Sequence, residues 1–298
     1  MKKITPPFEH GSEFANLLSN VSKLSYLQKR IFLHKLNKNP HPHFFYRYVS
    51  LDVKSDESIE KLRDVIVNSH LWLSSKEGFN DPFDTQAKTV ILGNPQQLRN
   101  KLNKSYKQLA PDVSGIKRKE AINKLMANQS DMLERVSKAV ADSLNKVGAC
   151  CFTSDPRNLL MWSHYANHHK GIILQFEVAK DTNTFLKTIT VDYVEDYPIV
   201  NWANETAKEI SKAFLNKHKS WKYEDESRII HPEGANTSLA FKPEALTAVI
   251  LGCKASQATK DKVKELLVER IDKNISPVKT YSALRHDSKY KIVIKRRI

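Results

Sequence analysis

Three short apolar runs constrain the fold of this chain more than any other feature of its sequence. They are VGACCFTS at residues 147–154, KGIILQFEV at 170–178 and LTAVILGC at 246–253. Runs of this length, bounded by polar and turn-forming residues, are typical of buried β-strands. The segments between them have helical and strand patterns in no regular alternation. This order predicts an α+β fold with a mixed or largely antiparallel, split sheet, rather than a doubly wound parallel sheet.

Helical patterns precede and interrupt these strands. Residues 13–38 carry apolar residues at helical spacing, and the sequence NPHPH at 39–43 ends that pattern. The segment from about 96 to 147 is also helical and strongly charged, with a break near APDVSG. We therefore expect a helical N-terminal appendage over 1–43 and a single α+β catalytic-type domain over 44–298, with a helical insertion at about 96–147.

The charge of the chain points to anionic partners. Its 298 residues include 48 lysines and arginines against 33 acidic residues, which gives a formal net charge of +15. The local excess is found at 101–124, 212–222 and 285–297. Such a charge favours encounters with nucleic acid or another polyanion. The alternative is a lysine-rich surface that serves solubility alone.

The cysteines and the hydropathy favour a cytoplasmic location. Cys150, Cys151 and Cys253 lie in apolar runs, which predicts reduced thiols inside a core and a reducing compartment. The first residues, MKKITPPFEHGSEF, lack the apolar stretch of a secretory signal. No run approaches about 18 consecutive apolar residues, so no membrane-spanning segment is expected.

An acidic pair is the main candidate for catalysis. The sequence WKYEDESRIIH at 221–231 predicts a strand with Glu224, Glu226 and Arg228 on one face. Carboxylates one pleat apart, roughly 7 Å from each other, can hold one substrate at two points or perturb each other's titration. The alternative is a solvated strand face on which Arg228 neutralises the acids.

The loop FNDPFD at 79–84 is a second candidate. Pro82 restricts Asp81 to an extended conformation, and both Asn80 and Asp81 can bond the local backbone. A functional interpretation places Asn80 and Asp81 at the rim of a cleft beside Phe83. A structural turn is the alternative.

A third candidate is the aromatic and polar segment NLLMWSHYANHHKG at 158–171. Trp162, His164 and Tyr165 can line a pocket for a planar ring, or cap a helix that packs on the core. His164 and His168 have helical i,i+4 spacing, but no third ligand follows at a diagnostic spacing. We therefore expect no zinc site here.

Together these motifs resemble a known family. The sequences YRY, FNDPFD, CFTSD with LLMWSHYANHHKGIILQF, WKYEDESR and VILG occur in order over about residues 44–252. In this combination they are similar to a widespread bacterial domain family of unknown function. The resemblance names a fold neighbourhood and leaves the reaction open.

The order of elements is also similar to that of ADP-ribosyltransferases, which use NAD as a co-substrate. This resemblance implies that Arg47 holds the NAD phosphate or ribose and that Thr153 and Ser154 fill the middle-strand position. Glu226 would be the catalytic glutamate, with Glu224 assisting the acceptor. The implied activity is ADP-ribosyl transfer to nucleic acid or protein, or NAD glycohydrolysis, in a toxin or phage-defence effector.

Two other functions remain open from the residues alone. A metal-dependent nuclease would place Asp81, Asp84, Glu224 and Glu226 around a divalent ion. A non-enzymatic module would bind nucleic acid through its basic surface, with its acidic residues only supporting the sheet.

Overall fold

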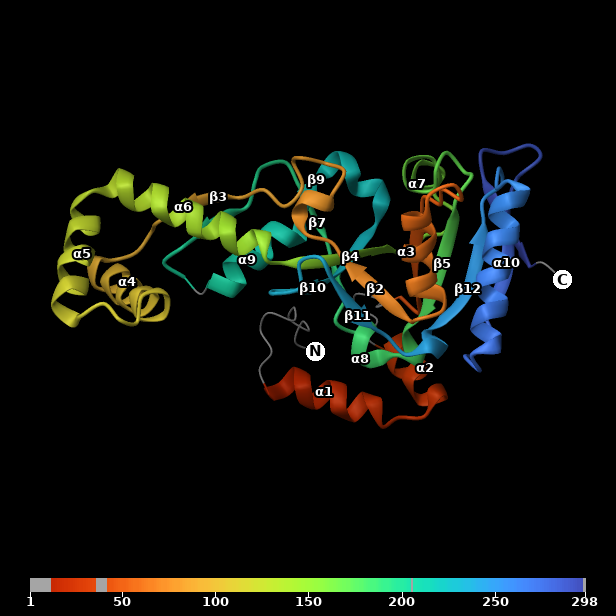
Figure 1. Ribbon diagram of the computed structural model, residues 1–298, viewed down its shortest axis with the longest axis horizontal. Coiled ribbons are helices and arrows are strands. Elements are labelled where there is room, and N and C mark those ends of the chain that lie inside the picture. Colours follow the sequence, from red (N-terminus) through yellow and green to blue (C-terminus); the bar gives the residue numbers. More distant parts are fainter. Residues whose placement is uncertain (1–11, 36–41, 205, 297–298) are drawn as a thin grey trace.

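The computed structural model describes residues 12–35, 42–204 and 206–296, and its centre is an eight-stranded sheet (Figure 1). In spatial order the strands are β14 (Ile292–Arg296), β13 (Lys279–Arg285), β12 (Leu246–Leu251), β5 (Ile172–Glu177), β1 (Phe44–Val49), β4 (Gly148–Thr153), β10 (Glu226–His231) and β6 (Ile189–Thr190). Strands β12 and β13 pair in parallel, and the other neighbours pair antiparallel. The predicted α+β class with a mixed, mostly antiparallel sheet is confirmed.

The three apolar runs form β4, β5 and β12, three of the most buried strands of this sheet. On one face their side chains join a cluster of phenylalanines. Phe152 and Phe176 have ring centroids 5.7 Å apart, and Phe185 lies 5.3 Å from Phe176. Burying each such ring stabilises the fold by roughly 1.5–3 kcal/mol, so this cluster is a main source of stability.

Helices α3 (Asp56–Ile66) and α10 (Gln257–Asp272) pack together beside this core (Figure 1). Helix α3 begins at the N-cap Ser55, whose side chain accepts a hydrogen bond from Ser58 N, and Asp56 and Glu57 lie in its first turn. Both features stabilise a helix N-terminus.

The opposite face of the sheet is covered by the short helix α7 (Leu159–Tyr165). Its Trp162 is completely buried and packs edge-on against Tyr48 of β1, with ring centroids 5.4 Å apart. This packing fixes α7 over β1, which places Tyr165 at the end of the helix beside the sheet.

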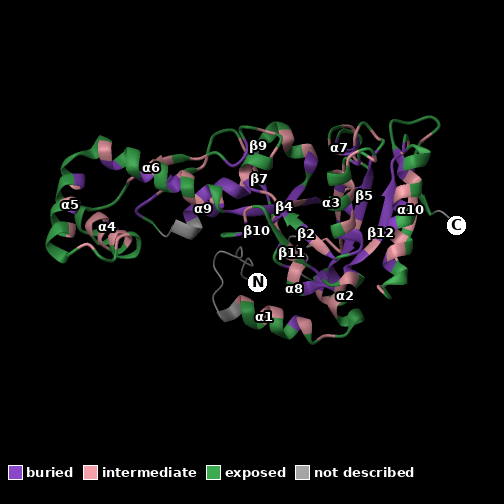
Figure 2. Ribbon diagram, in the orientation of Figure 1, coloured by how far each residue is buried: buried purple, intermediate pink, exposed green. Residues whose placement is uncertain are grey.

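A helical arm extends away from the sheet and consists of α4 (Pro95–Leu109), α5 (Gly115–Ala127) and α6 (Gln129–Asn145) (Figure 1). These three helices confirm the predicted helical character of 96–147. The arm has its own apolar cluster, formed with residues of α9 (Thr206–Leu215). At its root, β3 (Lys88–Val90) pairs in parallel with β8 (Ile199–Asn201). Figure 2 shows buried residues concentrated on the central strands and a largely exposed arm.

The predicted N-terminal helix forms two helices, α1 (Ser12–Ser22) and α2 (Tyr26–Lys35). The end of the predicted helical segment and most of the NPHPH break, at 36–41, lie outside the described residues, as do 1–11. The division into an appendage and a single domain at residue 43 therefore stays a prediction. Within the described ranges, no helix combines the length and hydropathy that crossing a membrane requires.

Candidate functional site

The acidic pair lies at the start of β10, and the local structure there differs from the prediction. Lys219–Glu224 form a short 3-10 helix, η4, and Asp225 adopts a left-handed conformation with φ 46°. The predicted strand over 221–231 is therefore wrong for its first five residues, since β10 begins at Glu226. Aspartate tolerates this conformation better than most residues. As a result, Glu224 and Glu226 do not share a strand face.

The two carboxylates nevertheless meet at one buried ammonium group. Lys217 Nζ lies 2.5 Å from Glu224 Oε2, 3.1 Å from Glu226 Oε2 and 3.4 Å from Asp84 Oδ2. It also lies 5.2 Å from the centre of the Trp221 ring. Lys217 belongs to β9 (Asn216–His218), which directly follows α9.

Arg228 completes the cluster from the core side. It is fully buried and binds Glu226 with Nε at 2.8 Å and Nη2 at 3.0 Å. Its Nη1 and Nη2 bind the two oxygens of Asp84 at 3.0 and 2.6 Å. Arg228 pairs with Glu226 as expected, whereas Glu224 pairs with Lys217. The solvated strand face is wrong, because Glu224 and Glu226 are only 2% and 5% exposed.

Asp84, Lys217, Glu224, Glu226 and Arg228 form what we call the ionic cluster. Three carboxylates face two cations, so the fully ionised cluster carries one excess negative charge. Burial raises the pKa of Glu224 and the charge of Glu226 adds to this, although Lys217 opposes it. At Glu226 burial also disfavours the charge, but Arg228 and Lys217 outweigh it and lower the pKa to about 2. One carboxylate is therefore held ionised, and its neighbour is the group that can exchange a proton.

A cavity of about 280 Å³, the carboxylate cavity, opens beside this cluster. Tyr46, Thr153 and Glu226 lie in register across β1, β4 and β10, and all three line it. Tyr165 also lines it and donates a hydrogen bond to Glu224 Oε1 at 2.5 Å. The sheet thus supplies the floor, and α7 brings a hydroxyl to the proton-exchanging carboxylate.

A comparison with known families matches one segment that contributes to this site. Residues 161–229 match the family described as "Protein of unknown function (DUF2971)". The matched segment runs from α7 to β10 and contains Tyr165, Lys217 and both glutamates. Neither the curated proteins nor the solved structures compared contain a match to the chain. The predicted resemblance to a family of unknown function is confirmed over this segment, and the similarity to ADP-ribosyltransferases stays a prediction.

Three other residues predicted to bind a ligand lie at the carboxylate cavity. Arg47 and Asn80 line it together with Thr153. Arg47 Nη1 donates to Cys150 Sγ at 2.7 Å, and Asn80 Nδ2 donates to Tyr165 Oη at 3.2 Å. The matched segment and the FNDPFD loop therefore contribute to one site.

Four predicted residues are placed elsewhere among the described residues. Trp162 is in the core, where its Nε1 donates to Pro156 O at 2.9 Å, because α7 turns this side chain toward the sheet. Ser154 is exposed and donates to Asp225 Oδ2. His164 is exposed beside Tyr223. Asp81 lines a second cavity, described next.

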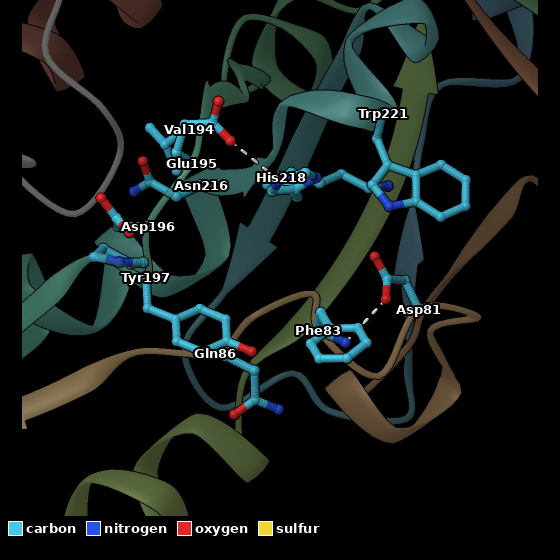
Figure 3. A pocket seen from close by; sticks show the side chains of 12 residues that line it. Asp81, Phe83, Gln86, Val194, Glu195, Asp196, Tyr197, Asn216, His218 and Trp221 are labelled. Atoms are coloured by element: carbon cyan, nitrogen blue, oxygen red, sulfur yellow. Dashed lines mark hydrogen bonds and ion pairs between the residues drawn. The ribbon is translucent and has the colours of Figure 1, made fainter.

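The second cavity, the aromatic cavity, has a volume of about 570 Å³, and Lys217 lines both it and the carboxylate cavity. Figure 3 shows this second cavity. Three rings surround it in the close-up, from Phe83, Tyr197 and Trp221. Glu195 at its edge pairs with His218 at 3.3 Å. The remaining lining residues are Asp81, Gln86, Val194, Asp196, Pro198, Asn216 and Lys217.

Sequence patterns missed two residues of the ionic cluster. No sequence motif includes Lys217, and Asp84 is predicted only as a metal ligand of the nuclease alternative. In the structure Asp84, Glu224 and Glu226 surround an ammonium group, and within the described ranges no group of three His, Cys, Asp or Glu residues is placed to hold a metal ion. The lysine-rich composition left no local signal that would have separated Lys217 from its neighbours.

Proposed function

We propose that this protein cleaves the N-glycosidic bond of NAD at the carboxylate cavity, as an ADP-ribosyltransferase or an NAD glycohydrolase. The observation that carries the proposal is the excess negative charge of the ionic cluster in the wall of that cavity. Breaking this bond leaves positive charge on the ribose. A fixed negative charge next to it stabilises the transition state without reorganisation.

Glu226 is the group that supplies this charge. Its lowered pKa of about 2 keeps it ionised at neutral pH. Arg228 binds it from the core side and Lys217 binds its Oε2, so its orientation is fixed before substrate arrives. Pre-organised ionised groups are the largest single contribution to catalysis in many enzymes.

Glu224 is the group that moves the proton. Its raised pKa makes it a stronger base than an ordinary carboxylate, which suits it to accept a proton from a water molecule or another acceptor. Tyr165 donates to it and orients it. Two neighbouring carboxyl groups with pKa values shifted in opposite directions are the arrangement that glycosidic chemistry uses.

The dimensions of the cavity suit part of NAD. At about 280 Å³ it is close to the smallest ligand cavities, of about 300 Å³. It therefore fits the nicotinamide–ribose half, with Tyr46 as a stacking surface, while the adenosine half extends outside. Arg47 lines the same cavity, but its guanidinium donates to Cys150 Sγ of the core on the other face of the sheet, so the phosphate contact implied for Arg47 has no support in this geometry.

The test is release of nicotinamide by the full chain. Incubation with adenylate-labelled NAD and a cell extract should give free nicotinamide, and labelled nucleic acid or protein if the reaction is a transfer. Glu226→Gln should lower kcat by about 100-fold or more. Glu177→Gln, a buried carboxylate of β5 outside this cavity, is the matched control and should keep wild-type turnover.

The outcomes separate the enzyme from its alternatives. Undiminished turnover in a folded Glu226→Gln variant, or no turnover at all, would contradict the proposal. The second candidate function is a nucleic-acid-binding module without enzymatic activity. The observation behind it is that Glu226 and Arg228 are almost completely buried and paired with each other. It predicts salt-dependent nucleic-acid binding that Glu226→Gln leaves unchanged. As a toxin or phage-defence effector, the enzyme should arrest growth on expression, and Glu226→Gln should abolish the arrest.

A further inference from the structure

The helical arm carries a large share of the positive charge of the chain. Between residues 95 and 127, eight lysines and arginines face two acidic residues, a net +6 of the total +15. Five of these lysines are exposed on α4 and α5: Lys104, Lys107, Lys117, Lys119 and Lys124. The 15 residues of α4 span about 22 Å. On α4 the exposed lysines lie in the last six residues, and on α5 they run from Lys117 to Lys124, so the arm presents a basic surface to several successive phosphates.

The aromatic cavity offers stacking surfaces that the proposed reaction does not use. Phe83 is 67% exposed and Tyr197 is 49% exposed, and both face the cavity that Trp221 lines (Figure 3). Stacking of a nucleobase on such a ring is favourable for every base. Asp81 and Asp196 line the same space and present carboxylate acceptors.

The aromatic cavity lies next to the base of the helical arm, where β3 and β8 pair. Gln86, in the cavity wall, lies two residues before β3, and Pro198 directly precedes β8. These two strands pair in parallel, and α6 of the arm packs on β3. Figure 1 shows β3 between the arm and the region of β7 (Asp192–Val194) and β9. A chain that runs along the arm therefore arrives at the aromatic cavity.

We propose that the arm and the aromatic cavity together bind a single-stranded nucleic acid, with phosphates on the arm and one unpaired base stacked in the cavity. The role of this strand as the acceptor of ADP-ribose rests on the proposed function. The binding of the strand itself is independent of the proposed function.

The lining of the cavity decides which part of the nucleotide enters. Carboxylates repel a phosphate, so the base enters and the phosphates stay on the arm. Asp81 and Asp196 accept hydrogen bonds, which favours bases with an exocyclic amino group. Adenine and cytosine have this group and thymine does not. The site should therefore prefer oligo(dA) or oligo(dC) to oligo(dT).

An anionic membrane is the competing partner for a basic arm. Leu109 and Ile116, at the turn between α4 and α5, are 83% and 74% exposed. Lys107, Lys117 and Lys119 lie close to this turn, but the exposed rings of Phe83 and Tyr197 lie at the root of the arm, away from the turn. A flat membrane that contacts the turn would leave these rings unused, whereas a strand that extends along the arm reaches them, so the positions of the rings favour the strand.

The test is fluorescence anisotropy of the full chain with labelled 12-nucleotide DNA and RNA oligomers, without NAD. Replacing Lys104, Lys107, Lys117 and Lys119 with glutamine should weaken binding at least tenfold. It should also reduce the slope of log K against log salt by about 3, at about 0.7 per phosphate contact. The matched control replaces four exposed lysines at the other end of the molecule, Lys254, Lys264, Lys279 and Lys289, and should leave the slope close to that of the wild type.

Cavity variants test the base. Phe83→Leu with Tyr197→Leu should weaken binding about tenfold, whereas Tyr290→Leu, a fully exposed ring elsewhere, should not. Asp196→Asn should reduce the preference over oligo(dT). Unchanged binding in the arm or the cavity variants overturns the inference, as does tighter binding to anionic vesicles than to oligomers.

The outcome is separable from that of the proposed function. Nucleic-acid binding by Glu226→Gln at wild-type affinity, with or without NAD turnover by the wild type, supports this inference independently. NAD turnover by a protein that binds no oligomer overturns this inference and leaves the proposed function standing.

Discussion

Replacing Lys217 with methionine should destabilise the protein through the charge balance of the ionic cluster. Methionine has a similar length but no charge, so three carboxylates would then face Arg228 alone and the net charge would fall from −1 to −2. Removing one partner of a buried ion pair costs about 3–5 kcal/mol. At about 2 °C per kcal/mol in a chain of this size, Tm should fall by about 6–10 °C.

The pH dependence distinguishes this cause from simple loss of packing. Burial raises the pKa of Glu224 in the folded chain. The folded state therefore binds a proton more tightly than the unfolded state, and the free energy of unfolding falls as pH rises through the raised pKa. Lys217 opposes that rise in pKa. Without it the pKa of Glu224 should be raised further and the decline should continue to higher pH, so the variant should lose more stability at pH 8 than at pH 5.

Thermal and urea unfolding followed by circular dichroism measure both effects. Lys219→Met is the matched control, because Lys219 is exposed and pairs with Glu195 at the surface, where removal should cost at most about 1 kcal/mol. The double variant Lys217→Met/Glu224→Gln restores a net charge of −1 and should recover much of the lost stability. A Lys217→Met variant as stable as the control, or a loss independent of pH, would refute the reasoning.

Three further predictions follow from single contacts. Tyr165→Phe removes the donor to Glu224 and should raise the pKa of that carboxyl further. Because Glu224 acts as a base, the acid limb of the turnover profile should shift to higher pH, and kcat should fall about tenfold. Gly171→Ala should cost about 2 kcal/mol or more, since a Cβ there would lie 2.2 Å from Val49 O; urea unfolding measures it, and wild-type stability would contradict it. Cys150 is buried with a raised pKa, so it should react with a thiol reagent only after unfolding, as mass spectrometry of labelled peptides can check.

Local patterns were sufficient to predict the elements and one part of the site. The apolar runs at β4, β5 and β12 formed strands because their length and composition suit a surface buried on both sides. The charged segment at 96–147 formed helices, where Asn94, Ser114 and Asn128 cap the N-termini. The pair Glu224 and Glu226 was found from spacing alone, although the strand that was meant to hold both begins only at the second.

Local patterns did not predict which residues of one helix face the core and which face the cavity. Trp162 and Tyr165 lie three residues apart on α7, and the sequence pattern predicts that both can line a pocket. The sheet decides between them: the larger ring is buried against Tyr48, and the tyrosine reaches the cavity at the end of the helix. Which of the two side chains is buried depends on the surface against which the helix packs. The spacing of residues within the helix gives no information about that surface.

The sequence by itself therefore determined the α+β class, the positions of the main strands and helices, and an acidic pair as the centre of interest. Only the tertiary structure brought Asp84, Lys217 and Arg228 together around that pair. These residues come from three separate segments, and their charges are individually unremarkable among 48 cations and 33 acids. Burial distinguishes these three residues from the other charged residues, because a buried charge is stable only when oppositely charged groups lie within a few ångströms.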